Sequence, residues 1–537
     1  MALDLLITFM PTMFNLHSRN LNVAGVFFIS ITIIIVSAFL LQLRKKQLPL
    51  PPGPPRWPVV GNIPELLFNG SASKWLHSLL HKHASPIVCV RLGAIHVIVI
   101  NSPKIAREIV KEKDEIFASR PLTIGTNYCS RGHLSTAHAQ WGAQWKKMRR
   151  VVAFELLSPA RHKWLQGKRM EEADNLLHYI WKQCQHSTSP PLVNIRNVAR
   201  QYTGNVMRKL IFNTRYFGTG PAKQDGGPGP EEEEHVEALF RVLALEYNIC
   251  VSDYLPALRW LDIGGEEKEM IKWVNVVDKH HTPPIEERFN LKRGSLSSSA
   301  QSPEDLLDIL ISAEDVEGAP LLTLEDVKAQ VADLFYAGVD NSSYAVEWAL
   351  AEMLIQPQIM LKAMKEIDLE VGKERLVEES DISKLNYVKA CAKEALRLYP
   401  LSPFNLPHMS MENTTLAGYH IPKGSHVLLS RMEMGRNPQV WEDPLRFCPD
   451  RFMKDDGLLV DFGEPELRFI SFGAGRRGCI GTLLGISMTM MLLVRLLQGF
   501  NWSLPPHGTV HLDLDLALTY PLHALPTPRL SHHLYPK

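Results

Sequence analysis

The chain has 537 residues, of which 45% are hydrophobic and 21% are charged, and its formal net charge is +1. A nearly neutral chain of ordinary globular composition lacks the basic surface that nucleic-acid binding requires, so we expect no nucleic-acid partner. Its seven cysteines are an odd number without paired spacing. This excludes a disulfide framework and fits a reducing compartment.

Near the N-terminus, residues 23–43 form an apolar stretch without a charged residue. A helix of that length is about 30 Å long, enough to cross the hydrocarbon core of a bilayer. Arg44, Lys45 and Lys46 follow directly, so the positive-inside rule places the rest of the chain in the cytosol. The stretch is too long for a signal peptide. We therefore expect a lumenal tail over 1–22 and a single uncleaved anchor over 23–43.

A basic and proline-rich hinge over residues 44–57 separates the anchor from the remainder of the chain. Proline at this density forms neither helix nor central strand and makes a stiff spacer. Apolar residues alternate over 87–92 and 95–100, which predicts a β-hairpin that turns at Gly93 and Ala94. Much of the rest reads as helical, including 237–251 and 324–355. Residues 58–537 are therefore predicted to form one large, mainly helical domain.

A glycine-rich loop contains the most informative cysteine of the chain. Phe472, Gly475, Arg477, Cys479 and Gly481 share one short segment, and an apolar helical stretch over 483–497 follows. Glycines allow a tight turn that brings amide N–H groups toward the sulfur. Arg477 adds a positive charge that favours a thiolate or pairs with a carboxylate of a cofactor. The pattern suits a single thiolate that holds an iron.

The spacing Phe-x-x-Gly-x-Arg-x-Cys-x-Gly resembles the haem-binding loop of the cytochrome P-450 superfamily, in which the cysteine is the proximal iron ligand. The resemblance implies haem b as cofactor, with Cys479 on the iron and Phe472 and Arg477 as further haem contacts. It also implies a mainly α fold with small β-sheets, the cytochrome P-450 fold, behind one transmembrane helix. The expected location is the endoplasmic reticulum membrane. Electrons would come from NADPH–cytochrome P-450 reductase.

Two further haem contacts follow from the same resemblance. Trp145 and Arg149 are spaced i and i+4 within Trp-Lys-Lys-Met-Arg, and in the family such a pair holds a haem propionate. His408 falls where the family often has a propionate-binding arginine or histidine. A basic helix face would explain Trp145 and Arg149 equally simply if they stood alone.

The resemblance also implies a buried charge network behind the haem. Glu394 and Arg397 lie three residues apart on one predicted helix face, and Arg451 follows before the cysteine loop. Their order is that of the Glu–Arg–Arg network of the superfamily, whose role is structural.

Residues 337–342 lie in the middle of a long predicted helix and are similar to the oxygen-binding segment of the superfamily. Asp340 retains the acid of that segment, Asn341 stands in place of the usual threonine, and Ser342 follows. We expect these three to be the catalytic residues. Gly338 is expected to leave room for O2.

The Asp-Asn pair and several other segments resemble the plant amino-acid N-monooxygenases. That subfamily resemblance implies O2-dependent conversion of an L-amino acid to its aldoxime, through two N-hydroxylations, loss of water and loss of CO2. The expected setting is specialised metabolism of the cyanogenic glycoside or glucosinolate type, with phenylalanine or another aromatic substrate slightly favoured. Phe404 and Asn405 are expected in the substrate pocket, with Arg131, and more weakly His133, as ligands of the substrate carboxylate.

Two alternatives stay open from the residues alone. The missing threonine fits a haem-thiolate isomerase or dehydratase that works without O2 and without a reductase. A membrane-tethered haem protein without catalytic activity would carry the same cysteine loop. Product formation without NADPH favours the first, and the absence of turnover favours the second.

Overall fold

The computed structural model describes residues 32, 48–186, 191–217, 227–294, 302–459, 464–506, 510, 512–513, 517–518 and 520–536. The chain divides into two units, Met1–Pro49 and Leu50–Lys537. The predicted lumenal tail and anchor lie outside the described residues, apart from residue 32, and stay predictions. Of the predicted hinge, residues 48–57 are described.

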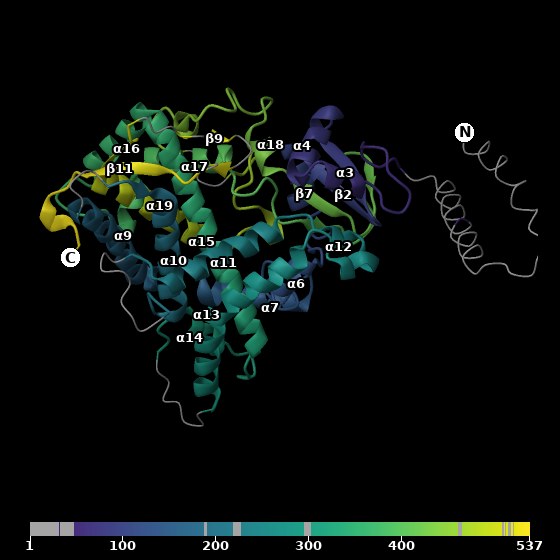
Figure 1. Ribbon diagram of the computed structural model, residues 1–537, viewed down its shortest axis with the longest axis horizontal. Coiled ribbons are helices and arrows are strands. Elements are labelled where there is room, and N and C mark those ends of the chain that lie inside the picture. The colour runs from purple at the N-terminus through teal and green to yellow at the C-terminus, as the bar shows by residue number, and fades with distance from the viewer. Residues whose placement is uncertain are drawn as a thin grey trace, which may run out of the picture. The chain divides into compact units, whose positions relative to one another are not determined.

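The longest helix of the second unit is α15 (Leu324–Ile355), which matches the helix predicted over 324–355. Thr323 and Asp326 cap its N-terminus reciprocally: the Thr323 Oγ1 accepts the Asp326 N–H, and the Asp326 carboxylate accepts the Thr323 N–H. Most of its residues are buried, and they lie on every side of the helix, so α15 is a core helix. It packs on α10, α17 and α19 (Figure 1).

The other helices surround α15 and confirm the prediction of a mainly α fold. In chain order they are α3 (Ile63–Phe68), α4 (Ala72–Lys82), α5 (Pro103–Arg107), α6 (Ile124–Cys129), α7 (Ala143–Arg150), α8 (Pro159–Trp164), α9 (Gln166–His186), α10 (Ile195–Phe212), α11 (Pro230–Glu246), α12 (Val251–Tyr254), α13 (Glu266–Gly294), α14 (Leu306–Ile311), α16 (Pro357–Glu370), α17 (Asn386–Leu398), α18 (Arg431–Gly435) and α19 (Thr482–Gly499). Two π-helical turns, η1 (Glu108–Glu112) and η2 (Val151–Leu156), and short 3₁₀ turns connect them, namely η3 (Pro256–Leu261), η4 (Glu379–Lys384), η5 (Pro449–Phe452), η6 (Gly475–Arg477) and η7 (His532–Leu534).

Helix α11 differs from the helix predicted over 237–251. It begins earlier, at Pro230, because proline suits the first turn of a helix and because the Glu232 carboxylate accepts the Gly229 N–H at 3.0 Å. It ends at Glu246, and α12 starts separately at Val251. The first turn of α11 carries the acidic run 231–234, of which Glu232 is buried and Glu231 and Glu233 are exposed.

The predicted hairpin is present, with β1 (Ile87–Leu92) antiparallel to β2 (Ile95–Ile100). Strand β2 pairs in parallel with β7 (His426–Leu429), which pairs antiparallel with β4 (His408–Met409). The four strands form one sheet in the order β1-β2-β7-β4. In Figure 1 β2 and β7 lie beside α3 and α4, and α15, α10 and α19 lie further along the unit.

Successive side chains of the hairpin enter different clusters, because strand residues alternate between the two faces of a sheet. Val88 and Val90 pack with Leu76 and Leu79 of α4. The opposite face packs against α5 and η1. Both faces of the sheet are therefore covered.

Three smaller sheets complete the described strands: β3 (Val193–Asn194), β11 (His523–Pro528) and β8 (Phe500–Ser503); β5 (Thr414–Leu416) with β6 (Tyr419–Ile421); and β9 (Leu512–Asp513) with β10 (Ala517–Leu518).

Among the described residues, α19 is the one helix that is long and apolar enough to cross a membrane. Most of α19 is buried inside the protein, where it packs against α9, α15 and α16. Its apolar character is therefore that of a core helix. It matches the helical stretch predicted directly after Cys479.

Candidate active site

Cys479 closes a tight loop that leads directly into α19. Its backbone N–H donates to the Phe472 carbonyl at 2.8 Å. Gly475 has a φ of +67°, and a Cβ there would lie 2.2 Å from the carbonyl oxygen of Val110. No side chain fits that space, so packing against η1 requires a glycine here in addition to the turn.

The Cys479 side chain is accessible from outside the protein, although protein atoms crowd it on most sides. Burial raises the pKa of its thiol, and the Gly481 N–H, the Thr482 side chain and the charges of Arg149 and Arg431 oppose that rise. Amide donors and cations around a cysteine stabilise the thiolate form, which is the form that binds a metal ion.

Arg477 is hydrogen-bonded to backbone carbonyls, whereas Arg149 and Arg431 are the cations that oppose the rise in the Cys479 pKa. The Arg477 Nε donates to the Ala118 carbonyl at 2.5 Å and its Nη2 to the Ala139 carbonyl at 2.6 Å. Burial, and then repulsion by Arg120 and Arg149, lowers the pKa of Arg477 to about 8. Arg477 therefore belongs to a crowded group of cations, which we call the arginine cluster (Arg120, Arg149 and Arg477).

Negative charge only partly offsets the arginine cluster: Glu246 opposes the lowering of the Arg120 pKa, and Asp114 opposes that of the Arg477 pKa. Arg120 donates through Nη1 to the carbonyls of Leu406 and Pro407 at 2.7 and 2.9 Å, and burial lowers its pKa to about 10. Within the described part of the chain, neither Arg120 nor Arg477 is hydrogen-bonded to a carboxylate. Two buried guanidinium groups on carbonyls alone would be stabilised by an anionic ligand.

Trp145 independently indicates an anionic ligand at the same place. Its indole Nε1 is buried and has no hydrogen-bond partner among the described residues. The Arg477 guanidinium lies 4.8 Å from the centre of its ring. A buried donor without an acceptor is costly unless a ligand satisfies it. Haem carries two propionates beside its iron, so Cys479, Trp145 and the arginine cluster fit haem as a donor set.

Arg149 and His408 fit the predicted propionate contacts less directly. Arg149 donates through Nη1 to the Gly478 carbonyl at 2.7 Å, so it also supports the cysteine loop. The His408 Nδ1 donates to the Phe117 carbonyl at 2.8 Å. Burial, Arg120 and Arg477 lower the pKa of His408 to about 3. A neutral imidazole that donates through Nδ1 has no proton on Nε2 for a carboxylate, so Arg120 is the better placed donor.

The three consecutive residues expected at the oxygen site point in different directions, because each helical step turns by about 100°. Asn341 is exposed and lies one turn from the exposed Ala337, whose carbonyl accepts its Nδ2 at 3.1 Å. Asp340 is buried, and burial raises its pKa to about 7 against the opposing charges of Arg200 and Arg196. Asn341 and Ala337 thus form an accessible strip on a helix that is otherwise mostly buried.

Ser342 and Gly338 face neighbouring helices. The Ser342 hydroxyl points at the Gly485 carbonyl of α19, 3.4 Å away. A Cβ on Gly338 would lie 2.5 Å from the Met207 Sδ of α10. Gly338 therefore makes room for Met207, which corrects the expectation that it makes room for O2. Both residues set the distances between α15 and its neighbours.

The predicted charge network is formed by the three expected residues. Arg397 donates hydrogen bonds to the Glu394 carboxylate through Nε at 2.6 Å and through Nη2 at 2.8 Å. The Arg451 Nε donates to the same carboxylate at 2.9 Å. The side chains of Glu394 and Arg397 have no exposed surface. A buried carboxylate with this many donors fixes α17 to the segment before the cysteine loop.

A cavity of about 1160 Å³, including its opening to solvent, lies between the sheet and the ends of α11 and α6. Phe404 and Asn405 line it, as do Arg120, Tyr247 and Tyr254. The Phe404 ring stacks on His77 of α4 at 4.6 Å. The Asn405 Oδ1 accepts the Leu429 N–H at 3.0 Å, which holds this loop against β7.

Arg131 and His133 do not line this cavity. The Arg131 guanidinium pairs with Asp278 at 2.6 Å and Glu325 at 3.1 Å, which ties the loop after α6 to α13 and α15. His133 lies 3.0 Å from the Thr126 hydroxyl. With two carboxylates already bound, Arg131 is poorly placed to hold the carboxylate of a substrate.

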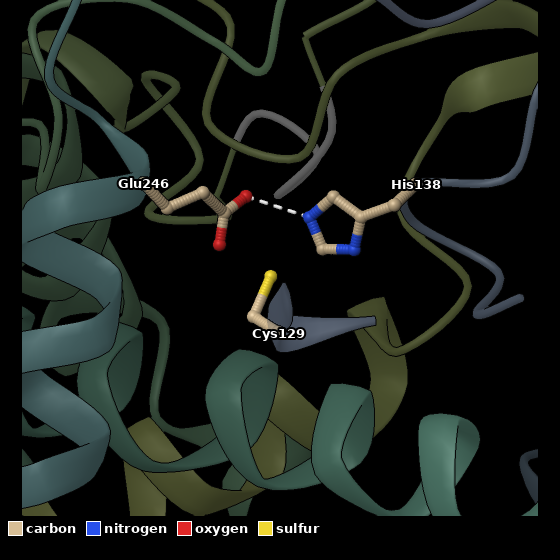
Figure 2. Close-up of side chains that lie close together, drawn as sticks. All are labelled: Cys129, His138 and Glu246. Atoms are coloured by element: carbon tan, nitrogen blue, oxygen red, sulfur yellow. Dashed lines mark hydrogen bonds and ion pairs between the residues drawn. The ribbon is translucent and has the colours of Figure 1, made fainter. Parts of the chain in front are cut away.

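One wall of the cavity carries a buried group of titratable side chains. Figure 2 shows the Glu246 carboxylate directed at His138, with the Cys129 sulfur directed toward the space between them. The Glu246 Oε1 accepts from the His138 Nε2 at 2.7 Å, and ligand atoms of all three residues lie within 4.8 Å of one another. Burial, Glu246 and Asp333 raise the pKa of Cys129 well above its ordinary value, so its sulfur stays a protonated thiol. The group is therefore a hydrogen-bonded pair of a carboxylate and an imidazole beside a thiol.

Sequence reasoning missed Arg120, His138 and Glu246. Arg120 stands before a proline in an ordinary-looking segment. His138 and Glu246 are 108 residues apart, and no local spacing joins them. Only the packing of the end of α11 against the loop after α6 brings them together.

The cytochrome P450 family model matches residues 51–527. The tyrosine N-monooxygenase of Sorghum bicolor is 52% identical over 91% of this chain and 88% of its own length. The phenylalanine N-monooxygenase of Arabidopsis thaliana is 50% identical over 91% of this chain and 93% of its own. A tryptophan N-monooxygenase of Prunus mume is 49% identical over 93% and 94%.

The extent of these matches includes the cysteine loop, the arginine cluster, the accessible strip of α15 and the cavity. The resemblance first indicated by the cysteine spacing is confirmed, and with it the haem b cofactor of this family. The chain belongs to the cytochrome P450 family.

Proposed function

We propose that the chain converts an L-amino acid to its aldoxime by two N-hydroxylations, dehydration and decarboxylation. The observation that carries this proposal is the similarity to amino-acid N-monooxygenases, at about half identity over nine tenths of the chain. Those relatives are named for different amino acids, so what they share is oxidation at the amino nitrogen. When bound, haem supplies reductive activation of O2.

Different residues of the chain would have different roles in this reaction. Cys479 would hold the iron, and Trp145 with the arginine cluster would hold the propionates. Asn341 on the accessible strip of α15 is the member of the predicted catalytic segment that faces open space. Asp340 is buried beside it, and burial raises its pKa to about 7, so near neutral pH this carboxyl can take up or release a proton away from bulk water.

An aromatic side chain is the favoured substrate class. Phe404, Tyr247 and Tyr254 give the cavity aromatic walls, which suit an aromatic ring through edge and stacking contacts. Phenylalanine is one such substrate, as are tyrosine and tryptophan. Asn405, bonded to β7, fixes the position of Phe404 in that wall.

Electrons would come from NADPH through NADPH–cytochrome P450 reductase at the endoplasmic reticulum membrane, with residues 23–43 as the anchor and the catalytic domain in the cytosol. Lys146 and Arg150 are exposed on α7, as an acidic partner would require. Lys147 is engaged with Asp326 at 2.8 Å.

The proposal is tested by expressing the full chain in microsomes with a reductase and offering each protein amino acid in turn. The expected result is an aldoxime, identified by mass, that forms only with NADPH and O2. A product formed without NADPH would identify a haem-thiolate isomerase or dehydratase. Haem incorporation without turnover of any amino acid would identify a non-catalytic haem protein.

A further inference from the structure

Glu246 is a buried carboxylate in the wall of the cavity. Its side chain is 3% exposed, and that of its partner His138 is 6% exposed. Charged groups buried this deeply are costly unless they are paired. His138 provides the pairing: burial lowers its pKa, but the carboxylates of Glu246 and Asp333 outweigh burial and leave the pKa raised.

The imidazole is held from both sides. Its Nδ1 lies 3.0 Å from the Ser135 hydroxyl and 3.9 Å from the Asp333 carboxylate. Its Nε2 donates to the Glu246 Oε1 at 2.7 Å. The imidazole therefore cannot rotate away, and it fixes the Glu246 carboxylate in one orientation.

This pairing uses only one of the Glu246 oxygens. Among the described residues, no hydrogen bond reaches its Oε2. A carboxylate accepts several hydrogen bonds, so Glu246 keeps capacity for a donor that enters the cavity. A donor that also carries positive charge would bind it most strongly, since charge-assisted hydrogen bonds are stronger than neutral ones.

The other carboxylates of the cavity wall are less suited. Glu267 already accepts from the Tyr128 hydroxyl at 2.8 Å and from the Arg259 Nε at 3.0 Å. Asp253 accepts the Ile124 N–H at 2.7 Å, and burial raises its pKa to about 6. Burial also raises the pKa of Glu266. Glu246, in contrast, pairs with a buried imidazole that is itself held from both sides.

We propose that the Glu246 carboxylate binds the α-ammonium group of the substrate. The inference rests on the proposed function, because an amino acid brings this cation into the cavity whatever its side chain. Recognition at this point is common to all amino acids, whereas the aromatic wall around Phe404 would distinguish among their side chains.

The test measures binding of two ligands to the haem-loaded, full-length protein. One ligand is the amino acid that is turned over, and the other is its deaminated analogue, the same side chain on propanoic acid. Glu246→Gln keeps the shape of the side chain and removes its charge. We expect Kd for the amino acid to rise about 10- to 100-fold and Kd for the analogue to change less than about threefold.

Glu267→Gln is the matched control, because Glu267 lines the same cavity and is engaged with Arg259 and Tyr128. It is expected to leave both Kd values unchanged. Glu246→Asp keeps the charge on a shorter side chain and is expected to fall between wild type and Glu246→Gln. It also tests the inference if the glutamine variant does not fold.

Two results would overturn the inference: an unchanged Kd for the amino acid, or an equal loss for both ligands. The second would assign Glu246 to a group that both ligands share. Failure of the proposed function is seen separately, as a wild-type protein that forms no aldoxime.

Discussion

The cysteine loop and the cavity wall are built in opposite ways. The loop is one continuous segment, residues 472–481, closed by the local hydrogen bond from the Cys479 N–H to the Phe472 carbonyl. The wall is assembled from segments far apart in the chain, and its charged pair joins residues 108 positions apart. The continuous motif identifies the cofactor, and the discontinuous cavity wall would determine which substrate the cofactor acts on. The two regions should therefore respond differently to substitution.

The largest expected effect separates the two cysteines of these regions. Cys479→Ser removes the thiolate, so we expect loss of the thiolate-type ferrous–CO spectrum and of turnover. Cys129→Ser, next to the His138–Glu246 pair of the cavity wall, is expected to keep that spectrum because its buried thiol is protonated. Absorption spectroscopy of both variants measures this. A thiolate spectrum that survives Cys479→Ser would remove Cys479 from the account.

The next effect concerns the network behind the loop. Glu394→Ala leaves the buried Arg397 guanidinium without its carboxylate, so we expect a loss of about 3–5 kcal/mol in the free energy of unfolding. Denaturant unfolding measures the loss. Lys362→Ala is the control, because Lys362 pairs with Asp450 at the surface. A Glu394→Ala loss as small as that of the control would contradict a structural role for the network.

Ionisation of Asp340 is expected to make the free energy of unfolding depend on pH, with an effect of intermediate size. Its pKa is about 7 in the folded chain, against an ordinary value of 3.8. The folded state therefore keeps a proton that the unfolded chain releases, and stability falls as the pH rises from about 4 to about 7. Asp340→Asn removes this dependence.

Between about pH 5 and about pH 8, the stability of Asp340→Asn relative to wild type should rise by about 3 kcal/mol. Unfolding at both pH values measures it. A difference that does not change with pH would mean that Asp340 is ionised throughout.

The smallest expected effect is on haem binding, through a residue that would hold a haem propionate. Trp145→Phe keeps an aromatic ring and removes the buried indole N–H, so we expect weaker haem binding by about 1–2 kcal/mol, or roughly tenfold faster haem loss. Transfer of haem to an acceptor protein measures the rate. Trp141→Phe, on the neighbouring ring 4.7 Å away, is the control. Equal rates in the two variants would mean that the indole N–H bonds no propionate.

Features that depend on local spacing were predictable from the sequence. The hairpin follows from alternation, the helix over 324–355 from a long stretch without proline, and the Glu394–Arg397 pair from the i, i+3 rule. The cysteine loop combines glycines and a cysteine in one run. Each of these is decided within a few residues or along one element.

Features that depend on how elements pack were not predictable. Asp340, Asn341 and Ser342 are neighbours in sequence, yet the helix turns them toward Arg200, open space and α19. Gly338 gains its role only because α10 brings Met207 against it. The same limit explains why Arg131 was expected to bind the substrate carboxylate, and why Arg120 and the pair of His138 and Glu246 were missed.

The most direct test of the account is isotopic. The full-length protein, with reductase and NADPH, is supplied with a ¹⁵N-labelled amino acid under an atmosphere of ¹⁸O2. The product is analysed by mass spectrometry. The account predicts an aldoxime that retains ¹⁵N and carries one ¹⁸O on that nitrogen. A product hydroxylated on carbon, or an aldoxime whose oxygen comes from water, would contradict oxidation at the amino nitrogen.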